Sequence, residues 1–308
     1  MSLPLILAVR KGRGKKQEKD FFVKPVRIGC VKYLNARPLI HGWTGGAVDL
    51  DHPAALCRKL DRGDLDVALV SSLEFLRRPI YRIVDGVSIS SRGEVYSVIV
   101  AHNEDLSRAD EIEIDPASET SVALLRCLLA KRGLHPGLVR KTDLKSVRPA
   151  ELHSAESETK GSREPGTANK MPAGRTDYVP VFRLLIGDQA IRFRAEHGDY
   201  FHYWDLAEAW MQTTLLPFVF ALWLIRPEVS DAEEIADALR QLRDRNLHNL
   251  DDLVSSQTEI SAEFCRKYYR EHLFFDFGER EKAGLREFHR RCLFNKIDVA
   301  SEMPLTLV

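Results

Sequence analysis

A polar turn after the first predicted strand is the strongest candidate for chemistry in this sequence. The segment VRIGC has the composition of a buried strand, and Asn35 follows it in the turn VKYLNARPL, where Arg37 and Pro38 come just before a predicted helix. An asparagine side chain can donate and accept hydrogen bonds at once, so Asn35 could hold a hydroxyl group while that group leaves its carbon atom. Asn35 could equally cap the helix that follows, and the spacing alone leaves both interpretations open.

Two clusters of hydroxyl side chains stand where other predicted strands end. Ser90 and Ser91 follow a strand in SISSRG, whereas Ser118, Thr120 and Ser121 surround the start of a helix in SETS. Hydroxyl groups and free backbone N–H groups at a helix start can bind a carboxylate or a phosphate. Two such clusters could therefore hold two anionic groups, although helix capping is the simpler explanation of the second cluster.

Asp188 repeats this strand-to-helix arrangement. It lies in LLIGDQA, directly after an apolar run and before a predicted helix. Its carboxylate is therefore expected either to cap that helix or to face a cleft at the end of the strand.

The common cofactor and metal motifs are absent. The sequence has no G-x-G-x-x-G after a strand, no G-x-x-x-x-G-K-[ST], no H-E-x-x-H, no paired C-x-x-C and no G-x-S-x-G. His289 and Cys292 stand three residues apart on a predicted helix, but no second pair of ligands accompanies them. We therefore predict no metal ion and no bound nucleotide.

The composition is that of a globular protein without a dominant charge. Lys plus Arg and Asp plus Glu both number 45, so no long-range field favours nucleic acid or an anionic membrane. The longest apolar run, 215–225, contains Pro217 and is shorter than the ~20 residues of a membrane span. The N-terminal apolar run precedes its charges, whereas in a secretory signal the charges come first. The five cysteines are odd in number, which argues against a disulfide framework. We expect a cytoplasmic protein, and its oligomeric state is left open.

Strands and amphipathic helices alternate along the chain, which predicts an α/β fold with parallel strands joined by helical crossovers. The segments near 95–101 and 218–225 are apolar on both faces and are expected to be crossing strands between two lobes. Two crossings imply a hinge and a cleft, and ligands of open α/β sheets bind beyond the carboxyl ends of the strands.

The expected organisation is two lobes with two additions. The predicted ranges are a flexible basic extension at 1–25, a first lobe at 26–97 and 220–308, and a second lobe at 98–219, with a polar insertion at about 143–178. The extension is basic and has no apolar period, and the insertion has almost no large apolar residue with which to build a core of its own.

Seven segments, taken in order, resemble the chorismate dehydratase family of menaquinone biosynthesis: IGCVKYLNARPL, LDVALVSSLEF, VSISSRGEVYSVIV, IDPASETSVALLRCLL, LLIGDQA, DLAEAW and LPFVFALW. They cover most of residues 26–225. The resemblance implies a two-lobed fold like that of type 2 periplasmic binding proteins, with a mixed sheet in each lobe. It also implies a cytosolic hydro-lyase of the futalosine route that needs no cofactor.

The implied reaction eliminates water from chorismate to give 3-[(1-carboxyvinyl)oxy]benzoate. Asn35 is assigned to the departing hydroxyl, with Ser90 as a second catalytic residue. The residues assigned to substrate binding are Ser91, Ser118, Thr120, Ser121, Asp188 and Thr214. These motifs contain no obvious histidine or glutamate to act as general base, so the enolpyruvyl carboxylate of chorismate is expected to take the proton.

One residue departs from the family pattern. Thr214, Leu215 and Leu216 stand where the family usually has threonine, glycine and leucine, and a leucine is expected to hinder positive φ or close ligand approach.

Two alternatives remain: the related dihydroxynaphthoate synthase, and a non-catalytic protein of the same fold that binds an organic anion.

Overall fold

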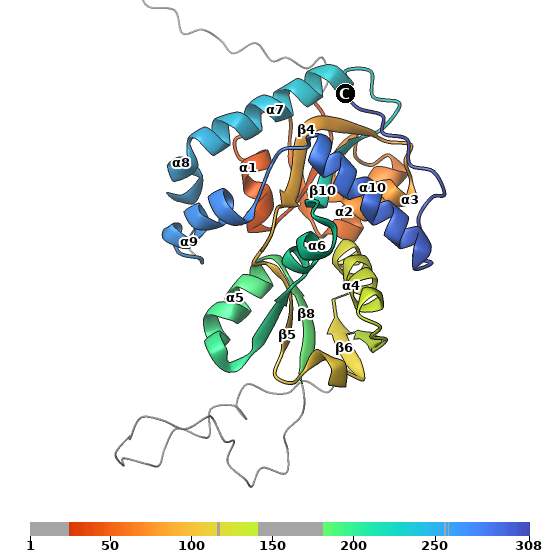
Figure 1. The fold of residues 1–308 in the computed structure, drawn as a ribbon. Helices are drawn as coiled ribbons and strands as arrows, with labels where there is room; N and C mark the ends of the chain where they lie inside the picture. The colour runs from red at the N-terminus through yellow and green to blue at the C-terminus, as the bar shows by residue number, and fades with distance from the viewer. Residues whose placement is uncertain (1–24, 116–117, 141–180, 256, 258) are drawn as a thin grey trace, which may run out of the picture.

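Two mixed β-sheets flanked by helices form two lobes, one above the other in Figure 1. The computed structural model describes residues 25–115, 118–140, 181–255, 257 and 259–308. The expected insertion, and the expected extension up to residue 24, lie outside these residues. Within the described ranges no helix is both long and apolar enough to span a membrane.

The first sheet has the strand order β2-β1-β3-β10-β4 and forms the centre of the first lobe. Its strands are β1 (Ile28–Val31), β2 (Val48–Asp51), β3 (Val67–Ser71), β4 (Arg82–Ser91) and β10 (Phe218–Ile225). The helices of this lobe are α1 (Arg37–Ile40), α2 (Pro53–Arg62), α3 (Ser72–Arg77), α7 (Ala232–His248), α8 (Leu250–Ser255), α9 (Ala262–Lys267) and α10 (Glu279–Phe294). A π-helical turn, Tyr268–His272, continues α9.

The second sheet has the order β7-β6-β8-β5-β9 and forms the centre of the second lobe. Its strands are β5 (Val98–His102), β6 (Glu111–Ile114), β7 (Gly137–Arg140), β8 (Phe182–Ile186) and β9 (His202–Asp205). Its helices are α4 (Glu119–Lys131), α5 (Gly187–His197) and α6 (Leu206–Thr214).

The chain passes between the two sheets twice, through residues 92–97 and 215–217. In each sheet one strand runs antiparallel to both of its neighbours, and that strand is the first one after a crossing: β5 in the second sheet and β10 in the first. Ser91 and Phe218, which flank the two crossings, are paired in the first sheet, so the crossings lie side by side at the junction of the lobes, which is the arrangement of a hinge.

An aromatic contact joins the lobes at the second crossing. The indole of Trp210 in α6 meets the rings of Phe218 in β10 and Phe288 in α10 edge-on, with ring centroids 5.3 and 6.0 Å away. All three side chains are buried. Such edge-to-face pairs add roughly 0.5–1.5 kcal/mol each to the burial of the rings themselves.

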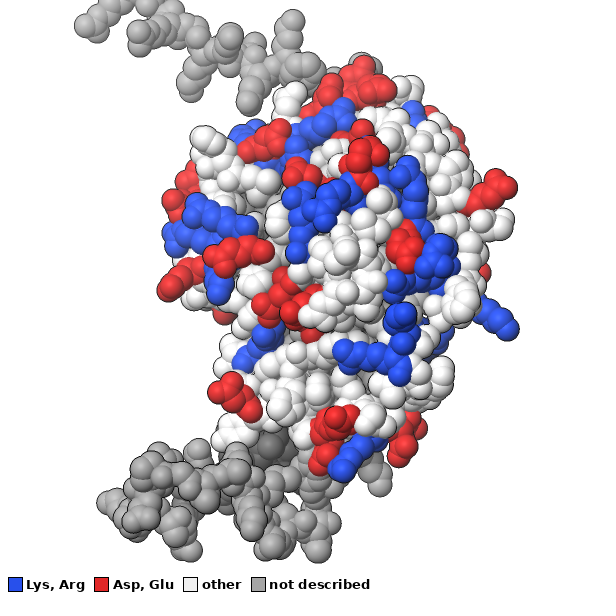
Figure 2. All heavy atoms as spheres, viewed as in Figure 1, with Lys and Arg blue, Asp and Glu red and all other residues white. Residues whose placement is uncertain are grey.

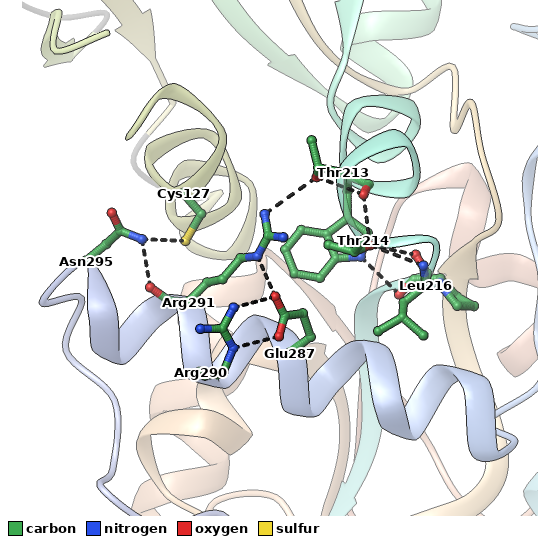
Figure 3. Close-up of polar contacts among 10 residues, drawn as sticks. Cys127, Thr213, Thr214, Leu216, Glu287, Arg290, Arg291 and Asn295 are labelled. Carbon is green, nitrogen blue, oxygen red and sulfur yellow. Dashed lines mark hydrogen bonds and ion pairs between the residues drawn. The ribbon is translucent and has the colours of Figure 1, made fainter. Parts of the chain in front are cut away.

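Polar side chains at α10 also contact the second lobe (Figure 3). Arg291 donates to the Glu287 carboxylate at 2.7 Å and to Thr213 Oγ1 at 3.5 Å, and its guanidinium lies over the Trp210 ring. Asn295 Nδ2 contacts the Cys127 sulfur in α4 at 3.8 Å. One helix of the first lobe thus holds two helices of the second.

The charged surface is mixed in sign. Figure 2 shows acidic and basic side chains interspersed over the face that it presents. This distribution matches the equal totals of the two charge types in the sequence. No single-sign field is therefore evident on this face of the molecule.

The Glu287 carboxylate should add stability that acid removes. Hydrogen bonds from Arg290 and Arg291 hold its pKa at about 2, below the ordinary 4.5. A lowered carboxylate pKa gives stability that is complete above the unfolded-state pKa and is lost as the pH falls toward the folded-state pKa. We expect Glu287→Gln to lower the free energy of unfolding by about 1 kcal/mol at neutral pH. Urea titrations should show this difference shrinking as the pH falls from 4.5 toward 2. Exposed Glu196→Gln is the control, and a pH-independent difference at Glu287 would contradict the assignment.

Leu215 adopts the left-handed conformation that was expected to need glycine. It ends α6 with φ 59° and ψ 18°, and its side chain is 75% exposed. A side chain in this conformation costs about 1 kcal/mol. We expect Leu215→Gly to raise the free energy of unfolding by about that amount in urea titrations. Leu293→Gly, on the regular helix α10, is the matched control and should lower the free energy by a similar amount. A loss of stability at both positions would argue against strain at Leu215.

Candidate functional site

A cleft lies between the two lobes. Its lining is mostly apolar and includes Ile89, Phe220 and Leu273. The polar side chains among its described lining residues are Tyr33, Asn35, Ser71, Ser97, Ser118, Glu119, Thr120 and Ser121. Four of these are predicted site residues: Asn35, Ser118, Thr120 and Ser121. A mostly apolar cleft with a few converging polar groups is typical of a small-molecule site.

Asn35 lines the cleft and carries a buried, unsatisfied polar atom. It lies in the single 3₁₀ turn Leu34–Ala36 after β1, and its Oδ1 atom is buried without a hydrogen-bond partner among the described residues. The N-cap residue of α1 is Ala36, so Asn35 does not cap the helix that follows. A buried amide oxygen without a partner costs roughly 1–3 kcal/mol, which a ligand hydroxyl could recover.

The turn that carries Asn35 contacts the second lobe. Leu34 N donates to Asp188 Oδ1 at 2.9 Å, across the junction of the lobes. Gly187, with φ 54°, lies against the Tyr33 ring, and a Cβ atom there would stand 3.2 Å from that ring. Burial is the main cause of a raised pKa at Asp188, and the Leu34 N–H partly offsets it. Asp188 is not a lining residue of the cleft.

The start of α4 presents hydroxyl groups to the cleft. Ser118 is the N-cap residue, yet its hydroxyl makes no cap hydrogen bond, so the capping interpretation fails for this residue. Thr120 Oγ1 lies 2.5 Å from Ser71 Oγ and accepts from Leu73 N at 3.3 Å. Thr120 therefore joins the N-terminus of α4 in the second lobe to that of α3 in the first. Ser118 and Ser121, also buried, have their hydroxyls at the same helix start.

Ser71 and Ser97 line the cleft but were not predicted. Ser71 ends β3, which is the strand end where ligands of α/β sheets are expected, so the rule applied to Asn35 could have found it. Ser97 lies in the first crossing, and its Oγ accepts from the buried Tyr268 hydroxyl at 2.6 Å. Burial raises the pKa of Tyr268, so it stays protonated and leaves the Ser97 proton available to a ligand.

The structure does not bring Ser90, Ser91 or Thr214 to the cleft. Ser90 Oγ donates to Phe274 O at 3.1 Å, and Ser91 Oγ donates to Gly93 O at 2.7 Å. Side chains alternate along β4, so Ile89 faces the cleft and Ser90 faces away from it. Thr214 Oγ1 donates to Trp210 O at 2.8 Å, within its own helix.

Helix N-termini place partial positive charge at the cleft. No lysine, arginine or histidine is found among its described lining residues. The carboxylate of Glu119 pairs with Arg77 across the lobes. Burial, with the charges of Asp115 and Asp188, raises the pKa of Tyr33 to about 12, so this phenol is neutral. The helices α4 and α5 both begin at the cleft, and their N-terminal dipoles favour an anion.

No metal site accompanies these groups. In the part of the chain that the structure describes, no three His, Cys, Asp or Glu side chains gather closely enough to hold a metal ion. His289 Nε2 instead lies 2.7 Å from Ala300 O. Its role in the described structure is a packing and hydrogen-bonding one.

A family model described as menaquinone biosynthesis matches residues 26–160 and 153–293 of this chain. The chain belongs to the menaquinone biosynthesis family. Among relatives, a chorismate dehydratase of Thermus thermophilus is 28% identical over 286 residues, which covers 86% of this chain and 94% of the relative. The expected resemblance is therefore confirmed at the level of the family.

Solved structures show which fold this chain resembles. A crystal structure of a protein from Archaeoglobus fulgidus has a TM-score of 0.63 at 16% identity, covering 88% of this chain and 98% of its own. The periplasmic aliphatic sulphonate binding protein of Escherichia coli has a TM-score of 0.55 at 9% identity, covering 88% and 87%. At these identities the likeness concerns the fold alone, and it confirms the expected periplasmic-binding-protein-like fold.

Substitution of Gly187 should loosen the contact between the lobes. Gly187→Ala combines left-handed strain with a Cβ atom against the Tyr33 ring, so Asp188 should hold Leu34 less well. Gly133→Ala is the matched control, because Gly133 has φ 67° and open space around it. Both variants should lose about 1 kcal/mol of stability from strain. We expect faster amide hydrogen exchange at Leu34 in Gly187→Ala alone. Equal exchange in the two variants would contradict the contact.

Proposed function

We propose that this chain is a chorismate dehydratase, a hydro-lyase that converts chorismate to 3-[(1-carboxyvinyl)oxy]benzoate. The observation that carries the proposal is the unsatisfied Asn35 Oδ1 atom at a cleft between two lobes. Family membership and the similarity to the Thermus thermophilus enzyme support it. The proposal includes a cytosolic location and chorismate as the partner.

The reaction is a redox-neutral elimination. The ring carbon that bears the enolpyruvyl ether loses its proton, and the electron pair of that C–H bond forms the new ring double bond. The neighbouring C–O bond breaks as this double bond forms, and the leaving hydroxide takes up the proton that the enolpyruvyl carboxylate removed from the ring, so that water departs. Asn35 is suited to the leaving group, because Oδ1 can accept from the hydroxyl in the ground state and the amide N–H can donate as negative charge develops on the oxygen.

The two carboxylates of chorismate must be bound by donors other than cationic side chains, because no lysine, arginine or histidine is found among the described lining residues. The first-turn N–H groups of α4, with the hydroxyls of Ser118 and Ser121, provide one set of donors. Ser71, whose hydroxyl lies 2.5 Å from Thr120 Oγ1, and Ser97 provide further hydroxyls for the second carboxylate or the ether oxygen. The apolar lining suits the planar aromatic ring of the product.

A protein base is not required in this mechanism. Glu119 is the carboxylate among the described lining residues, and it is engaged in an ion pair with Arg77. The enolpyruvyl carboxylate of chorismate is close to the acidic ring proton within the same molecule. An intramolecular base of this kind has a high effective concentration, so the substrate takes its own proton.

Incubation of the purified protein with chorismate tests the proposal directly. Loss of the chorismate absorbance together with the appearance of the carboxyvinyloxy-benzoate by mass spectrometry is the expected result. Binding without turnover would instead identify a non-catalytic anion-binding protein. If the protein neither binds chorismate nor turns it over, the result would favour the related synthase.

Removal of the Asn35 amide should reduce catalysis and spare binding. We expect Asn35→Ala to lower kcat by about 10²–10³-fold, because the leaving hydroxide loses its hydrogen bonds. The Kd for chorismate should change by less than about threefold, since both carboxylates keep their donors. The exposed Asn249→Ala is the control and should leave both constants unchanged. Steady-state kinetics and calorimetry measure the two effects, and equal losses in kcat and affinity would defeat the leaving-group role.

A further inference from the structure

Both polar groups of the Leu34 backbone are held by residues distant in the sequence. Its N–H donates to Asp188 Oδ1 at 2.9 Å, and its carbonyl accepts from the Tyr269 hydroxyl at 2.9 Å. Asp188 is 154 residues away, at the start of α5 in the second lobe. Tyr269 is 235 residues away, in the π-helical turn after α9 in the first lobe.

These two hydrogen bonds fix the backbone that carries Asn35. The Leu34 carbonyl belongs to the same peptide plane as the Asn35 N–H, so Tyr269 sets the direction in which the Asn35 side chain leaves the backbone. Leu34–Ala36 is a single 3₁₀ turn, and one such turn has little stability of its own. The conformation of Asn35 therefore depends on the groups that hold Leu34.

Asp188 has no contact with the cleft that would make it a substrate ligand. Its carboxylate is directed to Leu34 N, and it is not among the residues that line the cleft. Its position in the first turn of α5 also places its charge favourably in the helix dipole. Because α5 belongs to the second lobe and Leu34 to the first, this hydrogen bond forms only when the lobes are together.

We infer that Asp188 and Tyr269 are positioning residues, which aim the Asn35 amide into the cleft by holding the two polar groups of the Leu34 backbone. Asp188 supplies its hydrogen bond from the opposite lobe, so the catalytic geometry is completed by closure of the cleft. This inference rests on the proposed function, in which Asn35 handles the leaving hydroxyl. Tyr269 provides the part of the support that does not depend on closure.

Single substitutions distinguish the loss of one hydrogen bond from a general loss of folding. Asp188→Ala removes the acceptor and should lower kcat by about 10²-fold through misplacement of Asn35, with the Kd for chorismate changed less than about threefold. Asp188→Asn keeps an Oδ1 acceptor and should restore most of the loss. Tyr269→Phe should lower kcat by about tenfold. The controls are Asp199→Ala, an exposed aspartate after the same helix, and Tyr203→Phe, whose hydroxyl donates to the Gly198 carbonyl.

A double-mutant cycle decides whether Asp188 acts through Asn35. In the Asn35→Ala background there is no amide left to aim, so adding Asp188→Ala should lower kcat by less than about twofold further. Losses that multiply would overturn the inference, and so would an Asp188→Asn variant as slow as Asp188→Ala. A merely structural role would lower the melting temperature and affect both backgrounds equally.

A second readout keeps this test separate from the test of function. If the wild-type protein does not turn over chorismate, the proposed function fails. The positioning contact is then tested by amide hydrogen exchange at Leu34, which Asp188→Ala should accelerate at least tenfold and Asp188→Asn should change little. Unchanged exchange in Asp188→Ala would overturn the contact whatever the substrate is.

Discussion

The contact between the turn at residues 33–35 and the start of α5 is the constraint on which the cleft depends. The hydrogen bond from Leu34 N to Asp188 and the close approach of Tyr33 to Gly187 bring the two lobes together at the position of Asn35. Thr120 joins the lobes again at Ser71, which also lines the cleft. Each contact is small, but the lining of the cleft comes from both lobes, so the site exists only while these contacts hold.

The helix N-termini at the cleft explain how an anion could be bound without a cationic side chain. A salt bridge to a buried carboxylate would require a desolvated lysine or arginine, which is costly when the ligand is absent. Helix N-termini avoid this cost, because their N–H groups are fixed and carry only about half an elementary charge. Arg77, which could have served as such a cation, is paired with Glu119. Its positive charge offsets the negative charge of Glu119 at the start of α4.

Local patterns predicted the parts of the site that depend on local structure. Asn35, Ser118, Thr120 and Ser121 follow strands or begin helices, and those features can be recognised within a few residues. The direction of a side chain in a strand is harder to predict, because a shift of one residue reverses it. The pairing of β4 with β10 contains such a shift between Val219 and Ala221, where the register is irregular. The alternation within SISS therefore could not be assigned to a face from the sequence.

Long-range partners were not predictable for the same physical reason. Ser97 lies at a crossing, and its contact with Tyr268 spans 171 residues that no local pattern relates. The α/β class and the two crossings were predictable because they follow from the order of apolar strands and amphipathic helices. Asp188 was recognised as a candidate at a strand end, but its partner, Leu34 N, required the packing of the lobes.

The two crossings store backbone strain differently, which bears on the departure from the family pattern. Tyr96 at the first crossing has φ 67°, but its N–H donates to Asp205 at 2.7 Å and the Arg194 guanidinium lies 3.7 Å from its ring centroid. Leu215 at the second crossing has an exposed side chain, and its carbonyl accepts a hydrogen bond from Arg280. Because the Leu215 side chain does not reach the cleft, the leucine affects the stability of the hinge and leaves the chemistry of the site to Asn35.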